Sequence, residues 1–406
     1  MYIAQSSKED LLQKGEHGGA VTAILQSALK TNRVDGVVVV KAKDGDRFDG
    51  IPVLITHPEE LTQTAGALHS SSPNIPHFIT EYLDGGRTMK LAVVGKPCDI
   101  RAIIELQKRE QIHKENLILI GLNCSGTFPS AQAKEMFSIK FGVDPTQVIK
   151  EDIENGKVTI FLEDGSSKSQ SLSELEEDGY GRRENCRRCE VKIPRMADLA
   201  CGKWGAEEHK DSTFIEVCSE KGKALLNKAL EVGFINVKEP SQSDIQNRKL
   251  SEEAEIERSR AWEAEDYQPI LEMDQLQRLA YWIHEFNKCI KCFGCRDACP
   301  LCFCDDCVLE PEKGLIQRGS VPPNALFPLT RLAHVAHSCV NCGQCQDVCP
   351  MELPLTRLFT FVNKRSREIF NYVPGMDVNQ TPPLIGVTEE ELEIDATYLD
   401  ISSIQV

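Results

Sequence analysis

The chain has 406 residues, 41% of them hydrophobic and 27% charged, which fits a soluble globular protein of two or three domains. A formal charge of −16 argues against binding to nucleic acid or to an anionic membrane. Because no apolar run is as long as a membrane span and the N-terminus lacks a signal-peptide core, we expect a cytoplasmic protein. Its 17 cysteines, an odd number, fit metal ligands better than disulfides.

The first 238 residues alternate between helical and strand-like patterns. Residues 15–50 predict a glycine-rich loop, a helix and a strand, and LAVVG (91–95) and LILIGL (117–122) read as buried strands with a helix between them. A strand pair with an Asp-Gly turn is expected at 157–165, and a further strand and helix within 211–236. This alternation predicts an α/β domain with a mostly parallel or mixed sheet.

Three regions of different character follow. Residues 239–270 are dense in charge and predict a charged helical linker that contains the domain boundary. Residues 271–370 are helical in pattern and carry two cysteine-rich runs. Residues 371–406 form a C-terminal tail with a proline pair and an acidic stretch, and we weigh a loosely packed tail against a docking segment for a partner protein.

The two cysteine runs in 271–370 share the spacing C-x2-C-x2-C-x3-C-P, which is typical of bacterial two-cluster ferredoxins. In such proteins the fourth cysteine of each run ligates the other cluster, because three thiolates come from one tight loop and the fourth from elsewhere. Paired zinc sites are the alternative, although zinc needs only two C-x2-C pairs. We therefore expect two 4Fe–4S clusters, held by set one (Cys289, Cys292, Cys295 and Cys349) and set two (Cys339, Cys342, Cys345 and Cys299).

Three cysteines of the first run, Cys302, Cys304 and Cys307, are surplus to these sets. They could pack as small apolar side chains, contact cluster two through an S–H group, bind another metal or replace a ligand. The 39 residues between Cys299 and Cys339 exceed the loop of a small ferredoxin. With helical patterns on both sides of the second run, this region resembles the α-helical ferredoxin module of heterodisulfide reductase and related subunits.

Two features of the N-terminal half could form a site at the edge of the predicted sheet. Gly18 and Gly19 precede a helix, where free N–H groups attract a phosphate, although such a pair is common in α/β proteins. Cys98 and Cys124 each follow a predicted strand, so parallel strands would bring both thiols to one sheet edge. The alternative is that these two cysteines are ordinary buried thiols.

Over roughly residues 1–235 the chain resembles the coenzyme F420 hydrogenase/dehydrogenase β-subunit family. The resemblance rests on GEHGGAVTAILQSAL (15–29), ELTQTAGALHSSSPNI (60–75), VVGKPCDIRAI (93–103), and GLNCSGTF with NCRRCEVKIPRMADLACGKWG (121–128 and 185–205). It implies an α/β domain that binds FAD and coenzyme F420, a deazaflavin. The candidate contacts are His17, Gly18, Gly19, Thr22, Gly66, Ser70, Ser72, Asn74 and Lys96, of which the serines and Asn74 could instead cap a helix.

The same resemblance implies a third 4Fe–4S cluster, held by an N-terminal set of Cys98, Cys124, Cys186 and Cys189. Cys201 and Cys218 match no ligand spacing and are expected in the core. Around Cys186, residues 181–195 carry six basic and two acidic side chains, which is unusual in an acidic chain. A solvated basic face is the simple interpretation, but Arg182, Arg183, Arg187 and Arg188 could raise the potential of the cluster or attract the anionic tail of coenzyme F420.

The resemblance also implies how such a protein works. FAD would exchange hydride with coenzyme F420 and single electrons with three 4Fe–4S clusters, and we expect no catalytic acid or base. A flavin domain followed by a ferredoxin module is the order in family members that serve formate dehydrogenases of methanogenic archaea. This order predicts a molybdopterin-containing catalytic α subunit and a possible link to heterodisulfide reductase. The alternatives are a flavin-free electron-transfer adaptor, or the coenzyme F420 module of another oxidoreductase such as a hydrogenase or sulfite reductase.

Overall fold

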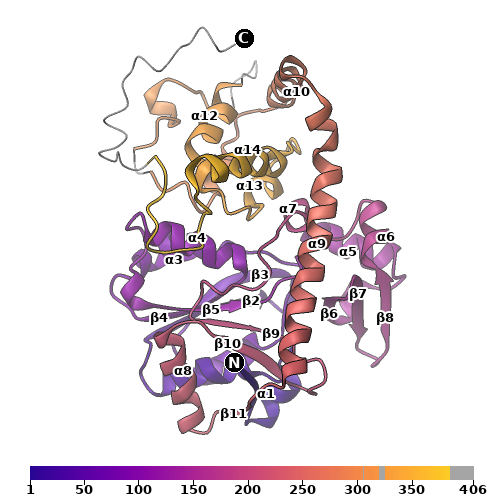
Figure 1. Cartoon of the computed structure of the whole chain (residues 1–406), viewed down its shortest axis with the longest axis vertical. Helices are drawn as coiled ribbons and strands as arrows, with labels where there is room; N and C mark the ends of the chain where they lie inside the picture. Colours follow the sequence, from indigo (N-terminus) through magenta and orange to yellow (C-terminus); the bar gives the residue numbers. More distant parts are fainter. Residues whose placement is uncertain (305, 320–324, 385–406) are drawn as a thin grey trace.

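The computed structural model describes residues 1–304, 306–319 and 325–384 and shows a sheet domain beneath a helical domain (Figure 1). None of the helices in these ranges is long and apolar enough to cross a membrane. The sheet domain is built on eight strands, in the order β11 (Ile235–Lys238), β1 (Tyr2–Ser6), β10 (Thr213–Val217), β9 (Leu199–Gly202), β5 (Leu117–Leu122), β4 (Leu91–Gly95), β2 (Gly36–Lys43) and β3 (Asp46–Ile55).

The sheet is mixed, with parallel strands at its centre. β2, β4, β5 and β9 pair in parallel, while the outer pairings with β3, β10, β1 and β11 are antiparallel. The predicted α/β domain is therefore confirmed, and β4 and β5 have the predicted bounds. Because Gly95 of β4 lies opposite Gly121 of β5, the chain leaves both strands at the same edge of the sheet.

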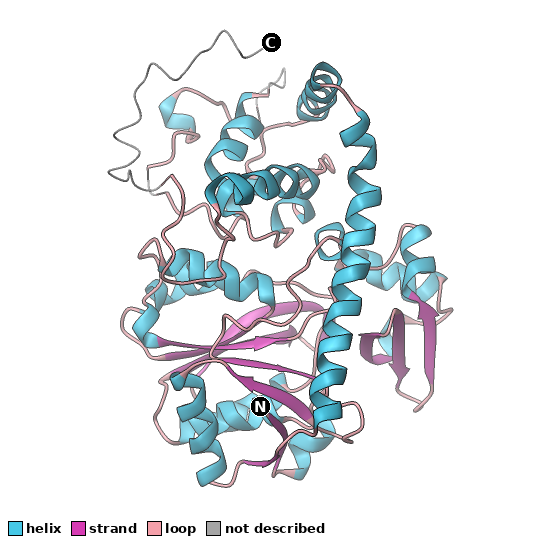
Figure 2. Cartoon of the chain, in the orientation of Figure 1, coloured by secondary structure: helices cyan, strands magenta, loops and turns pink. Residues whose placement is uncertain are grey.

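Helices cover both faces of this sheet (Figure 2). α1 (Glu9–Lys14), α2 (Ala20–Lys30) and α8 (Glu220–Glu231) pack on one face, against side chains such as Val37 and Ile120. α3 (Ile75–Leu83) and α4 (Pro97–Gln107) pack on the other face, against Val38 and Val93. The short, branched strand sequences are buried on both sides, as central parallel strands require.

A three-stranded antiparallel sheet lies beside the main sheet. It consists of β6 (Val148–Glu154), β7 (Lys157–Leu162) and β8 (Ser167–Ser171), and its core includes α5 (Ser130–Ile139) and α6 (Leu172–Glu177). The predicted strand pair with its Asp-Gly turn is β7 and β8. The strand β6 was not predicted, and it lines the candidate site described below.

The charged region 239–270 is one long helix, α9 (Gln242–Glu272), that runs along both domains (Figure 1). The sequence predicted a charged helical linker, and the region is helical, but α9 is not solvated all round because it buries a stripe that includes Arg248, Glu255 and Tyr267. Arg248 pairs with Glu216 of β10, so the charges of α9 are partly neutralised by the sheet domain. A helix with few apolar residues can pack this way because its ionic side chains find buried partners.

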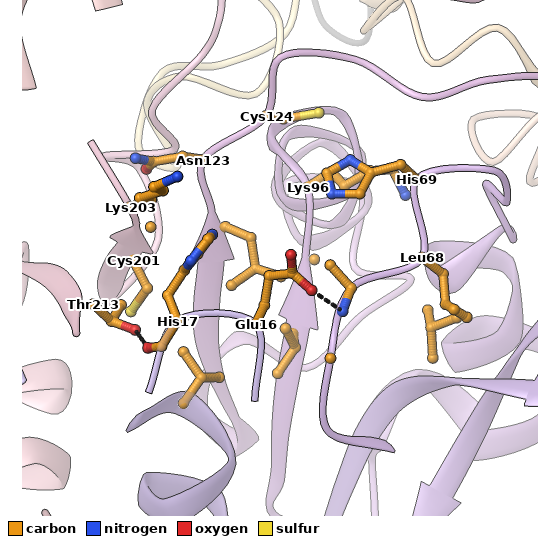
Figure 3. Close-up of a pocket in the computed structure, with 18 of the residues that line it drawn as sticks. Glu16, His17, Leu68, His69, Lys96, Asn123, Cys124, Cys201, Lys203 and Thr213 are labelled. Carbon is orange, nitrogen blue, oxygen red and sulfur yellow. Dashed lines mark hydrogen bonds between the residues drawn. The ribbon is translucent and has the colours of Figure 1, made fainter. Parts of the chain in front are cut away.

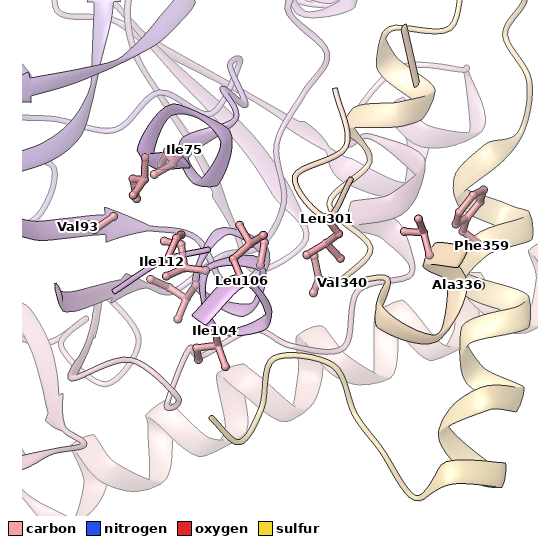
Figure 4. Close-up of a cluster of buried hydrophobic side chains, with 14 of the residues drawn as sticks. Ile75, Val93, Ile104, Leu106, Ile112, Leu301, Ala336, Val340 and Phe359 are labelled. Carbon is pink, nitrogen blue, oxygen red and sulfur yellow. The ribbon is translucent and has the colours of Figure 1, made fainter. Parts of the chain in front are cut away.

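The C-terminal helical domain sits on the α3–α4 face of the sheet domain. Leu301, Val340 and Phe359 belong to the same continuous core as Ile75 and Ile104 (Figure 4). Its helices are α10 (Gln275–Asn287), α11 (Gly294–Asp297), α12 (Leu326–Val335), α13 (Gln344–Asp347) and α14 (Leu355–Phe370), while the short α7 (Glu184–Arg187) comes from the sheet domain.

The beginning of the predicted C-terminal tail is not loosely packed. The side chain of Arg101 in α4 donates to the carbonyl of Pro374 at 2.8 Å, and Gly375 N–H donates to buried Glu105 at 2.7 Å. Tyr372 also hydrogen-bonds Glu105. Residues 371–376 therefore fasten the helical domain to α4, while the acidic stretch considered as a docking segment lies outside the described residues.

Candidate functional site

A cavity of about 280 Å³ opens where the parallel strands end (Figure 3). Its walls come from the carboxyl ends of β4, β5 and β9, from the middle of β2, from the start of α2, and from the loop after residue 64. His17 and Glu16 lie on one side, and Lys96 and Cys124 lie above them in the view of Figure 3. Open α/β sheets place ligands at this edge, because the strand connections leave a crevice there.

Two glycines form the turn that starts α2. Gly18 and Gly19 have φ of +72° and +63°, and a Cβ on Gly18 would lie 1.8 Å from the carbonyl oxygen of Asp211. Gly19 is the N-cap of α2 and offers no capping side chain, so the first N–H groups of the helix have no side-chain cap. Since Gly19 and Thr22 line the cavity, this helix start can hold an anionic group of a ligand.

The structure brings together five of the nine residues predicted for cofactor contact: His17, Gly19, Thr22, Gly66 and Lys96 line the cavity. Gly18 shapes the turn behind it, and the other three lie elsewhere. The N–H of buried Ser70 donates to Glu151, the Ser72 hydroxyl accepts from Arg183, and Asn74 caps α3 while donating to the carbonyl of Ala298. Ser71, rather than its neighbours, lines the cavity.

Several cavity residues escaped prediction. Lys203 and Trp204 follow β9, and the rule that parallel strands present their carboxyl ends at one edge could have found them once β9 was recognised. Asp152 and Glu154 come from β6 of the small sheet, and the sequence holds no signal that this sheet folds against the cavity. Their position depends on tertiary packing alone.

The cavity holds charged pairs of both signs. Lys203 contacts Glu154 at 2.6 Å and Asp152 at 3.7 Å, and Lys96 contacts Asp99 at 2.8 Å. Glu16, paired with Lys150 at 3.0 Å, brings a carboxylate oxygen within 4.8 Å of ligand atoms of His17 and Asp152. Since both acids of this trio already face lysines, the cavity is better suited to a polar organic ligand than to a metal ion.

We expect His17 to titrate well below an ordinary histidine. Burial lowers its pKa from 6.5 to about 4, against the opposing charge of Asp152. As the pH falls, the unfolded chain binds a proton at this histidine before the folded chain does. The contribution of neutral His17 to the free energy of unfolding is therefore complete above about pH 6.5 and is lost toward about pH 4. NMR of ring-labelled histidine, with the peak assigned through His17→Gln, measures this pKa. A midpoint near 6.5 would contradict the burial of His17.

The four cysteines of the N-terminal set converge beside this cavity. Cys98 lies in the first turn of α4, Cys124 follows β5, and Cys186 and Cys189 lie in and after α7. Burial raises the pKa of Cys124, and the charges of the neighbouring Cys186 and Cys189 raise it further. Burial also raises the pKa of Cys98, with Cys124 and Cys342 among the charges that it feels. Cys124 lines the cavity as well.

The arginines near Cys186 do not form a solvated basic face. Arg182, Arg183 and Arg188 are 1%, 3% and 2% exposed, and each pairs with a carboxylate. Arg187 is also buried, and its guanidinium lies 4.6 Å from the ring of Trp262. None of the four lines the cavity, so the structure does not bring them to a ligand there.

Each set in the helical domain surrounds a small internal cavity. One cavity is lined by Cys289, Cys292, Cys295 and Cys349, and the other by Cys339, Cys342, Cys345 and Cys299. In both, three thiols come from one run and the fourth from the other run, as the spacing predicts. The cysteines are all free, and the rest of each lining is mainly apolar. These cavities suit clusters bound by four thiolates, whereas a single zinc ion needs a much tighter group.

The surplus cysteines lie outside both cavities. Cys302 contacts Cys299 and receives a hydrogen bond from Arg331 at 3.6 Å, which favours the role of a neighbour to set two. Cys307 packs against the core, and Cys304 is exposed. Cys201 is buried in β9 as expected, while Cys218 is exposed.

Buried four-thiol sites in a helical domain, joined to a ligand cavity at a sheet edge, define an iron–sulfur electron-transfer protein. Comparison with known proteins gives the family. Profiles for the C-terminal and N-terminal parts of the coenzyme F420 hydrogenase/dehydrogenase β subunit match residues 88–243 and 1–78, and a 4Fe–4S dicluster domain matches residues 285–353. The chain belongs to the coenzyme F420 hydrogenase/dehydrogenase β-subunit family.

Individual relatives agree. The β subunit of F420-dependent formate dehydrogenase 1 from Methanococcus maripaludis is 45% identical over 95% of this chain and 97% of its own length. The corresponding subunit from Methanocaldococcus jannaschii is 44% identical, again over 95% of this chain and 98% of its own. A chain of the F420-reducing [NiFe] hydrogenase complex of Methanosarcina barkeri has the same fold over 65% of this chain and 90% of its own, with a TM-score of 0.56 and 20% identity.

Proposed function

We propose that the chain is the β subunit of an F420-dependent formate dehydrogenase and passes electrons between three 4Fe–4S clusters and coenzyme F420 through FAD. The observation that carries this proposal is the position of Cys124, which belongs to the N-terminal set and also lines the cavity. A ligand in the cavity would therefore touch the wall that holds one cluster. Bound FAD would supply the exchange between hydride transfer and single-electron transfer.

The cavity residues fit FAD. The start of α2 offers N–H groups to a diphosphate, and Lys96 and Lys203 bring positive charge. Glycines at positions 15, 19, 66, 95, 126 and 202 line the walls and let the ligand approach the backbone closely. His17, neutral at physiological pH, can hydrogen-bond the ligand without adding charge. The Arg182–Arg188 group is better suited to the N-terminal cluster, since Arg182 packs against Gly126 near Cys186.

The sets lie in an order that suits electron transfer. Cys98 is close to Cys342 of set two, and Asn185 and Asn341 join the two domains beside these sets. Each asparagine donates to the backbone carbonyl of the other, at 3.1 and 2.8 Å. Asn185 is the neighbour of Cys186 and Asn341 that of Cys342, so the hydrogen bonds link two ligand loops directly. Electrons would pass from set one to set two, to the N-terminal set and then to the cavity.

The C-terminal domain favours formate dehydrogenase over the sibling enzymes. The formate dehydrogenase relatives match 95% of the chain, whereas the β subunit of coenzyme F420 hydrogenase from Methanococcus voltae matches 58% and the F420-dependent sulfite reductase of Methanocaldococcus jannaschii 56%. We accordingly propose a molybdopterin-containing α subunit, docked near set one, as the source of electrons from formate. Heterodisulfide reductase is the second partner that we propose.

The test is to purify the chain and measure the FAD released by acid and the iron bound. We expect about one FAD and about twelve iron atoms per chain. Lys203→Met should weaken FAD retention about 10- to 100-fold, because Glu154 and Asp152 would then face the diphosphate without their counter-charge. Lys210→Met, a side chain that is 93% exposed, is the matched control and should leave FAD unchanged.

Absence of released FAD from the iron-loaded chain would instead support a flavin-free adaptor. Iron well below twelve atoms would argue against three clusters, whatever the flavin content. If the chain binds FAD and reduces coenzyme F420 but co-purifies with a subunit unrelated to formate oxidation, it would instead be the coenzyme F420 module of another oxidoreductase.

A further inference from the structure

Two buried arginines lie between neighbouring cysteine sets. Arg331 of α12 is 3% exposed and lines both cavities of the helical domain, the one surrounded by set one and the one surrounded by set two. The thiols that its charge reaches include Cys295 of set one and Cys299 and Cys345 of set two. Arg101 of α4 is 2% exposed and donates to the carbonyl of Val340, beside Cys339 of set two, at 3.2 Å. Its charge also reaches Cys98 and Cys189 of the N-terminal set.

Neither guanidinium is neutralised by a carboxylate of the described residues. Arg331 donates to Cys302 Sγ at 3.6 Å and lies 5.5 Å from the ring of Phe359, while its Nε has no hydrogen-bond partner. Arg101 donates only to the backbone carbonyls of Pro374 and Val340, and its Nη2 has no partner. An arginine keeps its charge even when buried, so each position carries a positive charge that the protein part leaves uncompensated.

Other buried arginines of the same region are treated differently. Arg183 pairs with Asp347 and Arg188 with Asp266, both within the interface between the domains. The chain therefore supplies carboxylates to buried arginines where the charge serves packing. Within the described residues neither Arg331 nor Arg101 pairs with a carboxylate, and the charges that each one feels include thiols of the proposed cluster sites, with Cys302 as a further neighbour of Arg331. Their missing counter-charge is then the cluster itself, since a cubane with four thiolates is an anion.

We propose that Arg331 and Arg101 are potential-setting residues, each shared by two successive 4Fe–4S clusters and each holding the reduction potentials of its two neighbours higher than they would otherwise be. This inference rests on the ligand sets of the proposed function. The chemical step is the addition of one electron to a bound cluster with no proton and no bond change. That step increases the negative charge beside a fixed guanidinium and is therefore favoured by it.

The two arginines should affect the reduction potentials of different pairs of clusters. Removing the charge of Arg331 should lower the potentials of the set-one and set-two clusters, and removing that of Arg101 should lower those of the set-two and N-terminal clusters. Set two, which neighbours both arginines, should respond to either change. A charge a few ångströms from a cluster in a partly polarisable interior shifts the reduction equilibrium about tenfold, which equals about 59 mV for a one-electron couple.

The experiment is a redox titration of the iron-loaded chain followed by EPR, on wild type, Arg331→Met, Arg331→Lys and Arg101→Met. Arg365→Met is the matched control, because Arg365 is also in the helical domain but is 74% exposed. We expect Arg331→Met to lower the potentials of two of the three clusters, each by an amount that corresponds to about a tenfold change in the reduction equilibrium constant. Arg331→Lys should restore most of this shift, and Arg365→Met should leave all three potentials unchanged.

Iron content separates failure of this inference from failure of the proposed function. If the variants keep wild-type iron and the potentials of the neighbouring clusters do not move, the inference is overturned while the ligand sets stand. If wild type itself binds too little iron for the clusters, the proposed function fails first. If Arg331→Met loses iron, the potentials of Arg331→Gln and Arg331→Lys are compared instead, because these two variants differ by one positive charge. Equal cluster potentials in Arg331→Gln and Arg331→Lys would also overturn the inference.

Discussion

Replacing Cys124 with serine is expected to remove about four iron atoms per chain and to stop coenzyme F420 reduction by electrons that enter through the helical domain. Cys124 stands at the only contact seen, within the described residues, between a cysteine set and the large cavity. Loss of a cluster ligand should reduce activity by more than the roughly 10- to 100-fold that follows loss of a hydrogen-bond partner of a ligand. Iron analysis and F420 absorbance with a low-potential donor measure both effects.

Cys218→Ser is the matched control for this experiment. Cys218 is exposed, matches no ligand spacing and lines none of the three cavities described. Its variant should keep the iron and the rate of wild type. Full iron in Cys124→Ser would remove Cys124 from the ligand set, whereas low iron with a normal rate would show that electrons reach the cavity by another route.

Local patterns in the sequence located the central strands β4 and β5 and predicted which cysteines of the helical domain come together. Short runs of branched apolar residues located β4 and β5, because a central parallel strand is buried on both faces and admits little else. The two cysteine runs predicted which thiols share a cavity, including the exchange of Cys299 and Cys349, because a cubane restricts the backbone that surrounds it. Both signals lie within a few residues of the chain.

The remainder of the site depends on contacts between distant segments. The arginines near Cys186 look like a surface patch in sequence, but Asp347, the partner of Arg183, is 164 positions away. Asp152 and Glu154 reach the cavity only because the small sheet folds against it. Ser70 and Ser72 sit one residue to either side of Ser71, which does line the cavity, and no periodicity in that loop could have chosen among them.

The exchange of fourth ligands gives the sharpest test of the helical domain. Cys299→Ser and Cys349→Ser should each lose about four iron atoms, but from different clusters. If the runs exchange ligands, Cys299→Ser removes the cluster of set two, which lies next to the N-terminal set through Cys342 and Cys98. Cys349→Ser removes the cluster of set one, whose cavity shares no lining residue with the N-terminal set. Cys307→Ser, outside both cavities, should keep all the iron.

EPR of the reduced chain distinguishes the two losses. Two neighbouring paramagnetic clusters broaden each other's signals, so the broadening that the N-terminal cluster shares with set two should disappear in Cys299→Ser and persist in Cys349→Ser. The opposite result would mean that each run holds its own fourth cysteine, and Cys299 would then belong with Cys289, Cys292 and Cys295. Because the N-terminal set meets the helical domain at Cys342, the same variant pair tests the order of the clusters. Of the two losses, only that of set two should interrupt the route from set one to the N-terminal set.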